Sequence, residues 1–125
     1  MLNNRCEIMG VLNITPDSFY DCKYLSKSSL QKKFINLESS DIIDIGAEST
    51  RPGAKSVPEN EEIRRIEEFL SLNLTHKKLS IDSYKSKVIE YCLINGFNMI
   101  NDISGGGKNF ENIDLSKEYH VPIVI

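Results

Sequence analysis

Two polar stretches of this sequence carry residue types suited to binding an anion and a divalent cation. Residues 13–19 (NITPDSF) and 46–53 (GAESTRPG) each come directly after a short apolar run. An apolar run that breaks into polar residues with Pro or Gly is typical of a buried parallel strand that delivers a loop at its C-terminal end. We interpret the two stretches as parts of one binding site; two ordinary strand-to-helix connections are the alternative.

Within these stretches, Asn13, Asp17, Thr50 and Arg51 fit a phosphate group together with a hard cation. Mg²⁺ takes oxygen ligands and keeps several waters, so one Asn carbonyl plus phosphate oxygens is sufficient. Thr and Arg side chains donate to phosphate, and Arg can do so through two parallel hydrogen bonds. The sequence contains neither a P-loop nor GxGxxG, so the nucleotide-binding folds with those motifs are not supported.

Two more polar residues, Asp82 and Asn101, directly follow the apolar residues Ile81 and Ile100. A carboxylate at the mouth of a core needs hydrogen-bond donors, which a heterocycle with adjacent ring N–H and amino groups supplies. An Asn side chain both donates and accepts, so it suits a heterocycle edge of mixed character. The pattern is equally consistent with Asp82 as the cap of the following helix. Asp44 is a predicted buried acid that either serves the site from below or is paired in the core.

Hydrophobic periodicity predicts the elements that position these residues. We expect five strands, at 7–12, 41–45, 79–82, 98–103 and 121–125. We also expect four helices: the first ends near Glu38, the second begins near Pro58, the third begins after Ser83 as its cap, and the fourth spans 110–119. Residues 104–107 (SGGG) are predicted to be a flexible link. Regular alternation of strand and helix predicts an α/β fold of parallel β/α units, with the site at the C-terminal ends of the strands.

Composition and charge narrow the class of protein. With 125 residues, 40% of them hydrophobic, and a net charge of -3, we expect one domain with a core and no nucleic acid as main partner. Cys6, Cys22 and Cys92 form no CxxC and predict free thiols in a reducing compartment. No apolar run suits a signal peptide or a bilayer span, so we expect a cytoplasmic protein without a membrane partner.

The motifs resemble the signatures of the dihydropteroate synthase family over essentially the whole chain. Residues 9–19 (MGVLNITPDSF) resemble the first signature and 46–54 (GAESTRPGA) the second, while 80–83 (SIDS) and 100–103 (INDI) match two later segments in order and approximate spacing. The resemblance implies that residues 1–125 are the N-terminal half of a pterin-binding (β/α)8 barrel. It also implies a transferase of folate biosynthesis that joins 4-aminobenzoate to 6-hydroxymethyl-7,8-dihydropterin diphosphate and releases pyrophosphate.

The resemblance further implies roles for individual residues. Asn13 would bind Mg²⁺ and the diphosphate, and Thr50 the diphosphate-bearing substrate. Asp82 and Asn101 would hold the pterin ring and, with Arg51, act as the catalytic residues. Two loops would close over the diphosphate and help to form the 4-aminobenzoate pocket, and they contain Asp17, Ser18, Arg51 and Pro52.

The sequence departs from the family pattern at 21–23 (DCK), where an Asp-Gly-Gly run is commoner, and at Ala47, where Gly is commoner. A (β/α)8 barrel needs about 200 residues or more, so we expect the isolated chain not to be an efficient synthase. A complementary C-terminal half or a homodimer would close the ring, and a truncated gene product is an equal alternative. Two other classes remain open: a pterin-binding or assembly fragment without turnover, and a methyltetrahydrofolate-binding domain of the corrinoid methyltransferase type.

Overall fold

A computed structural model describes residues 5–16, 27–49 and 52–125, apart from the side chain of residue 109. Strands and helices alternate along these residues, as the periodicity predicts. Their order is β1 (Met9–Asn13), α1 (Lys27–Ile35), β2 (Ile42–Gly46), α2 (Glu59–Ser71), β3 (Lys78–Asp82), α3 (Ser86–Ile94), β4 (Met99–Asn101), the short 3-10 helix η1 (Lys108–Phe110), α4 (Glu111–Glu118) and β5 (Ile123–Val124).

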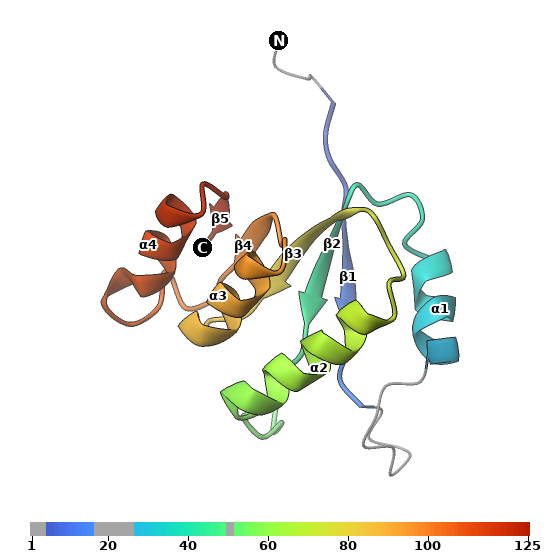
Figure 1. Cartoon of the computed structure of the whole chain (residues 1–125), viewed down its shortest axis with the longest axis horizontal. Helices are drawn as coiled ribbons and strands as arrows, with labels where there is room; N and C mark the ends of the chain where they lie inside the picture. The colour runs from blue at the N-terminus through green and yellow to red at the C-terminus, as the bar shows by residue number, and fades with distance from the viewer. Residues whose placement is uncertain (1–4, 17–26, 50–51) are drawn as a thin grey trace.

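The five strands form one parallel sheet in the order β1-β2-β3-β4-β5. Figure 1 shows α1 beside β1, and α2 and α3 in front of the strands that they connect. Sequential strand order with every crossover on one side is the arrangement of a (β/α)8 barrel, whereas a doubly wound sheet reverses its order and carries helices on both faces. The predicted α/β fold of barrel-type β/α units is therefore confirmed.

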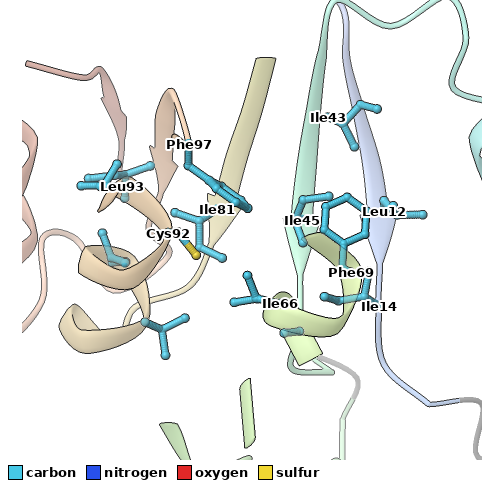
Figure 2. Packing of buried hydrophobic residues seen from close by; sticks show 14 of the residues in the cluster. Leu12, Ile14, Ile43, Ile45, Ile66, Phe69, Ile81, Cys92, Leu93 and Phe97 are labelled. Carbon is cyan, nitrogen blue, oxygen red and sulfur yellow. The ribbon is translucent and has the colours of Figure 1, made fainter. Parts of the chain in front are cut away.

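The core lies between the sheet and its helices. Leu12, Ile45 and Ile81 are almost completely buried, and so are the helical residues Ile66 and Phe69. Figure 2 shows Phe69 packed against β1 and β2, and Ile66 between this part of the core and Ile81. Each such side chain contributes about 1.5–3 kcal/mol when it leaves water. The face of the sheet that the helices cover is therefore where the fold gains its stability.

Helix α2 forms as its sequence predicts. Pro58 precedes its first residue, Glu59, where the missing N–H of proline costs nothing. Three acids stand in its first turn, where the helix dipole favours negative charge. Glu61 lies 3.2 Å from Arg65 one turn later, an ion pair at the i,i+4 spacing that supports a helix.

The start of α3 corrects two sequence-based expectations. This helix begins at Ser86 with Lys85 as its N-cap, so neither Ser83 nor Asp82 caps it. Asp82 instead ends β3. The Ser83 hydroxyl accepts the backbone N–H of Lys85 at 3.2 Å and donates to Glu62 Oε1 at 3.3 Å. A local turn of this kind competes with helix capping for the same hydroxyl.

The segment after β4 also differs from expectation. The predicted strand at 98–103 is shorter, Met99–Asn101, because Asp102 begins a turn. The Asp102 carboxylate accepts hydrogen bonds from the N–H and hydroxyl of Ser104 (2.7 and 2.6 Å), from Gly106 N–H (3.0 Å) and from Asn112 Nδ2 (2.9 Å). Residues 104–107 are therefore an ordered turn fastened to α4, and the prediction of a flexible link was wrong.

No helix among the described residues is both long enough and apolar enough to cross a membrane. Cys6 is exposed and Cys92 is buried, and both carry free thiols, as predicted. Cys22 lies outside the described residues.

Candidate functional site

Three of the predicted site residues stand in one row across the C-terminal ends of the strands. Strand pairing puts Asn13 opposite Gly46, Gly46 opposite Asp82, and Asp82 opposite Asn101. Residues paired in this way point to the same face of a sheet. In this row, polar groups from β1, β3 and β4 meet at the edge where the arrowheads of β1, β2 and β3 end in Figure 1.

The row lies on the face of the sheet that the helices do not cover. Leu12 precedes Asn13 and is buried in the core, so Asn13 points the other way, and its neighbour on that face, Val11, is 61% exposed. Gly46 leaves room in the row because it has no side chain. A Cβ built on Gly46 would lie 3.0 Å from Asn13 Oδ1 and 3.5 Å from Asp82 Oδ2. The side chains of Asn13 and Asp82 thus approach each other over Gly46.

Asp82 has the chemistry of a binding residue. Burial is the main cause that raises its pKa to about 6, and the negative charges of Asp44 and Glu62 add to the shift. No described residue donates a hydrogen bond to its carboxylate, so nothing on the described chain offsets the burial. A partly buried carboxylate without donors is unusual, and it favours a ligand that brings N–H groups.

The side chain of Asn101 is held in position by a buried acid on the neighbouring part of the sheet. Its Nδ2 donates to Asp44 Oδ2 at 2.8 Å, and Asp44 is itself only 2% exposed. Asp44 is therefore paired in the interior, one of the two roles left open by the sequence, and its partner is a residue of the row. With one N–H of Asn101 fixed, its amide oxygen and second N–H remain to face a ligand.

Asn13 is the metal ligand predicted from the sequence, and it is exposed at the end of β1. Its amide oxygen, near Asp82, is a hard donor of the kind that Mg²⁺ takes. Among the described residues, no group of three or more His, Cys, Asp or Glu side chains is arranged to hold a metal ion. A metal bound to Asn13 would therefore take most of its ligands from outside the described residues.

The remaining predicted residues belong to the two loops. Asp17, Ser18, Thr50 and Arg51 lie outside the described residues, so the structure does not place them. Pro52 is exposed. A pocket of about 230 Å³ lies at the described edge of the site, and it is lined by Glu48, Ser49, Asp82, Ser83, Tyr84 and Ile103.

Sequence reasoning missed an ion cluster behind this pocket. Lys85 Nζ lies 2.8 Å from Glu48 Oε2 and also binds the carboxylate of Glu62. Burial is the main cause of the raised pKa of Glu62. A signal was present in the sequence, because Glu62 lies one helical turn before Ile66 and so falls on the buried face of α2.

The sequence of residues 9–125 matches the model of a family described as pterin binding enzymes. Dihydropteroate synthase of Bacillus subtilis is 40% identical over 124 residues, a region that covers 94% of this chain and 43% of the relative.

Two solved structures are similar in fold as well. Dihydropteroate synthase of Xanthomonas albilineans with 4-aminobenzoic acid has a TM-score of 0.78 and 36% identity, over 96% of this chain and 46% of that one. The Clostridium difficile enzyme, in the presence of pteroic acid, has a TM-score of 0.75 and 36% identity, over 96% and 48%. The chain spans less than half the length of each of these three proteins.

Proposed function

Because this chain belongs to the family of pterin-binding enzymes, we propose that it forms the pterin and diphosphate side of a dihydropteroate synthase. The reaction joins 6-hydroxymethyl-7,8-dihydropterin diphosphate to 4-aminobenzoate and releases pyrophosphate. The observation that carries this proposal is the row Asn13–Gly46–Asp82–Asn101. In this row, a carboxylate that accepts no hydrogen bond from a described residue stands beside an amide that uses only one N–H on the described residues. The known structures with 4-aminobenzoic acid and pteroic acid support the same substrate class.

Asp82 and Asn101 recognise the pterin ring in this proposal. A pterin presents a ring N–H next to an exocyclic amino group, and these two donors match the two oxygens of one carboxylate. Each hydrogen bond to a charged group contributes about 1.5–3 kcal/mol, so the pair accounts for much of the binding energy. Asn101, which donates a hydrogen bond to Asp44 at 2.8 Å, forms hydrogen bonds to a neighbouring edge of the ring with its second N–H and its amide oxygen.

Asn13 lies at the diphosphate end of the site in this proposal. Its exposed amide oxygen fits Mg²⁺ as a single protein ligand, with phosphate oxygens and water completing the coordination. When bound, the metal would neutralise charge on the departing pyrophosphate. Five residues of the two loops are assigned to the diphosphate and the 4-aminobenzoate: Asp17, Ser18, Thr50, Arg51 and Pro52.

The chemistry that follows from these roles is substitution at the pterin methylene. The bond from this carbon to the diphosphate oxygen breaks, and its electron pair leaves with pyrophosphate. The amine of 4-aminobenzoate forms the new C–N bond and then loses one proton. Asp82 stabilises the electron-poor pterin that develops, because its negative charge faces the ring donors. A neutral aromatic amine needs little help from a base, which agrees with a site that offers no histidine among its described residues.

We propose that further β/α units complete the site, supplied by a complementary segment or by a second copy of this chain. Val11 and Val124, on the uncovered face, are 61% and 45% exposed. On the same face, Asp44 Oδ1 and Ser80 Oγ are buried and find no hydrogen-bond partner within the described part of the chain. An open apolar face and open strand edges favour association. The free thiols of Cys6 and Cys92 fit a reducing, cytoplasmic setting.

Calorimetry of the 125-residue chain with the pterin diphosphate and Mg²⁺ tests this function. We expect binding, and an affinity about 100-fold lower for Asp82→Asn, since two charge-assisted hydrogen bonds are weakened. Asp114→Asn is the matched control, because Asp114 is 73% exposed on α4. Undiminished affinity in Asp82→Asn contradicts the role of Asp82, and tighter binding of methyltetrahydrofolate than of the diphosphate favours the methyltransferase alternative. Formation of dihydropteroate then separates an enzyme from a binding fragment.

A further inference from the structure

The ion cluster of Lys85, Glu48 and Glu62 lies well inside the protein. The side chains of Lys85, Glu48 and Glu62 are 10%, 15% and 1% exposed, respectively. Charges at this depth are costly to desolvate, and a buried ion pair persists only when its geometry is good and its remaining hydrogen bonds are satisfied. An ammonium group has three N–H donors, and Lys85 uses them on three acceptors: Glu48, Glu62 and the carbonyl of Val57. None is left for a ligand.

The cluster joins the two ends of the connection between β2 and α2. Glu48 follows β2 closely, and its Oε1 accepts the backbone N–H of Val57, nine residues later, at 2.9 Å. Lys85 then binds both residues, Glu48 through its carboxylate and Val57 through its carbonyl. Closing a loop of this length costs entropy, and contacts that hold its two ends together offset that cost in the folded state.

The same cluster fixes the segment after β3. Ser83 donates to Glu62 Oε1 at 3.3 Å and accepts the N–H of Lys85 at 3.2 Å. Glu48 and Ser83 both line the pocket that contains Asp82. Burial lowers the pKa of Lys85, but its hydrogen bonds to Glu48 and Glu62 outweigh this effect and leave the pKa above its usual value, so the ammonium stays charged.

We propose that Lys85 is a positioning residue that holds the β2–α2 connection against the ligand pocket, by binding Glu48 and Val57 over the buried carboxylate of Glu62. Its role is therefore unlike that of a lysine that binds phosphate. Lys85 acts on the ligand only through Glu48 and the backbone at Val57. A purely structural lysine would stabilise the whole fold and would have no selective effect on this connection.

Hydrogen exchange of single backbone amides distinguishes the two roles. In the full 125-residue chain, Lys85→Met should accelerate exchange of the Val57 N–H at least about tenfold, because its acceptor Glu48 is released. The amides of Ile43 and Ile45 in β2 should change much less. Lys87→Met is the matched control, since Lys87 is 77% exposed and its ion pair with Glu59, at 3.6 Å, lies at the surface. Equal acceleration at Val57, Ile43 and Ile45, or no acceleration at Val57, overturns the proposal.

A second variant keeps the test decisive if Lys85→Met does not fold. Glu48→Gln removes the charge that faces Lys85 but keeps Lys85 paired with Glu62. It should also accelerate exchange at Val57 selectively. Unchanged exchange at Val57 in a folded Glu48→Gln chain overturns the proposal as well.

Ligand binding gives a further readout, and this arm rests on the proposed function. The pterin diphosphate should bind about tenfold more weakly to Lys85→Met, and Lys85→Arg should restore most of the affinity, because an arginine keeps the charge and several donors. Full affinity in Lys85→Met, despite fast exchange at Val57, overturns the positioning role toward the pocket. Absence of binding by the unmodified chain refutes the proposed function instead, and the exchange experiment still decides the role of Lys85.

Discussion

Asp82 and Asp102 lie at the ends of neighbouring strands, yet the protein treats their carboxylates in opposite ways. Asp102 is 1% exposed and accepts four hydrogen bonds from Ser104, Gly106 and Asn112. Burial raises the pKa of Asp102, but these donors outweigh it, so the pKa ends below its usual value. Asp82 accepts no hydrogen bond from the part of the chain that the structure describes, and its pKa is raised to about 6.

This difference separates an acid that serves the fold, Asp102, from one that we propose to serve a ligand, Asp82. A carboxylate whose donors come from its own chain stabilises the structure that supplies them. A carboxylate left without donors costs free energy until a ligand arrives, and such sites tend to be functional. Position at a strand end is thus not sufficient to assign a role, because Asp82 and Asp102 share that position.

The largest effect is expected from removing the satisfied acid. Asp102→Ala should lower the free energy of unfolding by about 3 kcal/mol or more, because several donors in a buried turn lose their acceptor at once. Asp82→Ala should not lower it, since no hydrogen bond to a described residue is lost and the cost of burying the charge is removed. Urea denaturation of both variants measures the contrast. Similar losses for the two variants would contradict the distinction between them.

The sequence allows some of this contrast to be predicted. That Asp82 and Asn101 lie side by side could be predicted because each ends an apolar run, and parallel strands bring such ends to one edge. The choice between ligand binding and helix capping for Asp82 could not be made, because it depends on where α3 begins. The role of Asp102 was missed because its partner Asn112 is ten residues away and the intervening glycines resemble a flexible link.

The ion cluster around Lys85 could not be predicted from the sequence either, because its members are far apart along the chain. Lys85 lies 37 residues from Glu48 and 23 from Glu62, and no local spacing rule relates them. The spacing of apolar residues along α2 places Glu62 on the buried face of this helix, but that spacing does not identify the partner of a buried charge. Long-range polar contacts depend on how the helices pack, which hydrophobic periodicity only partly specifies.

The next largest effect concerns pH. The Asp82 carboxylate must be charged to accept two N–H groups, so the affinity for 6-hydroxymethylpterin should fall about tenfold for each pH unit below about 6 and level off as the pH rises from there to neutrality. A ligand without phosphate keeps phosphate titration out of the profile. Asp82→Asn should bind weakly at every pH. A pH-dependent affinity that persists in Asp82→Asn would assign the titration to another group.

The same pKa predicts the sign of a stability effect. The folded-state pKa of Asp82 is about 6, above its ordinary value of 3.8, so its contribution to stability is fully present below pH 3.8 and is lost as the pH rises through 6. Asp82→Asn should therefore have a higher melting temperature than the unmodified chain at pH 7.5, and this gain should shrink toward pH 4. A melting temperature lowered at pH 7.5 would mean that the carboxylate has donors after all.

Two glycines, one near Asp102 and one near Asp82, allow a further test of the same comparison with smaller expected effects. The first is Gly107, near Asp102. Gly107 has a φ of +79°, and a Cβ there would lie 2.8 Å from Asn112 Nδ2, the donor to Asp102. Gly107→Ala should cost about 2 kcal/mol of stability, from backbone strain and a displaced Asn112. Thermal unfolding measures this loss. A neutral Gly107→Ala would show that Asn112 is not needed to order the turn.

The glycine on the side of Asp82 should affect binding rather than stability. In Gly46→Ala the new methyl would lie 3.0 Å from Asn13 Oδ1 and 3.5 Å from Asp82 Oδ2. Because Asn13 is exposed, its side chain can move aside at little cost, and unfolding should change by less than about 0.5 kcal/mol. Pterin diphosphate affinity should fall roughly threefold to tenfold, since the methyl group pushes apart the two groups that flank the ligand. Val11→Ala, one row away on the same face, is the control and should bind normally. A loss of stability without a loss of affinity would make Gly46 a packing residue and would remove it from the site.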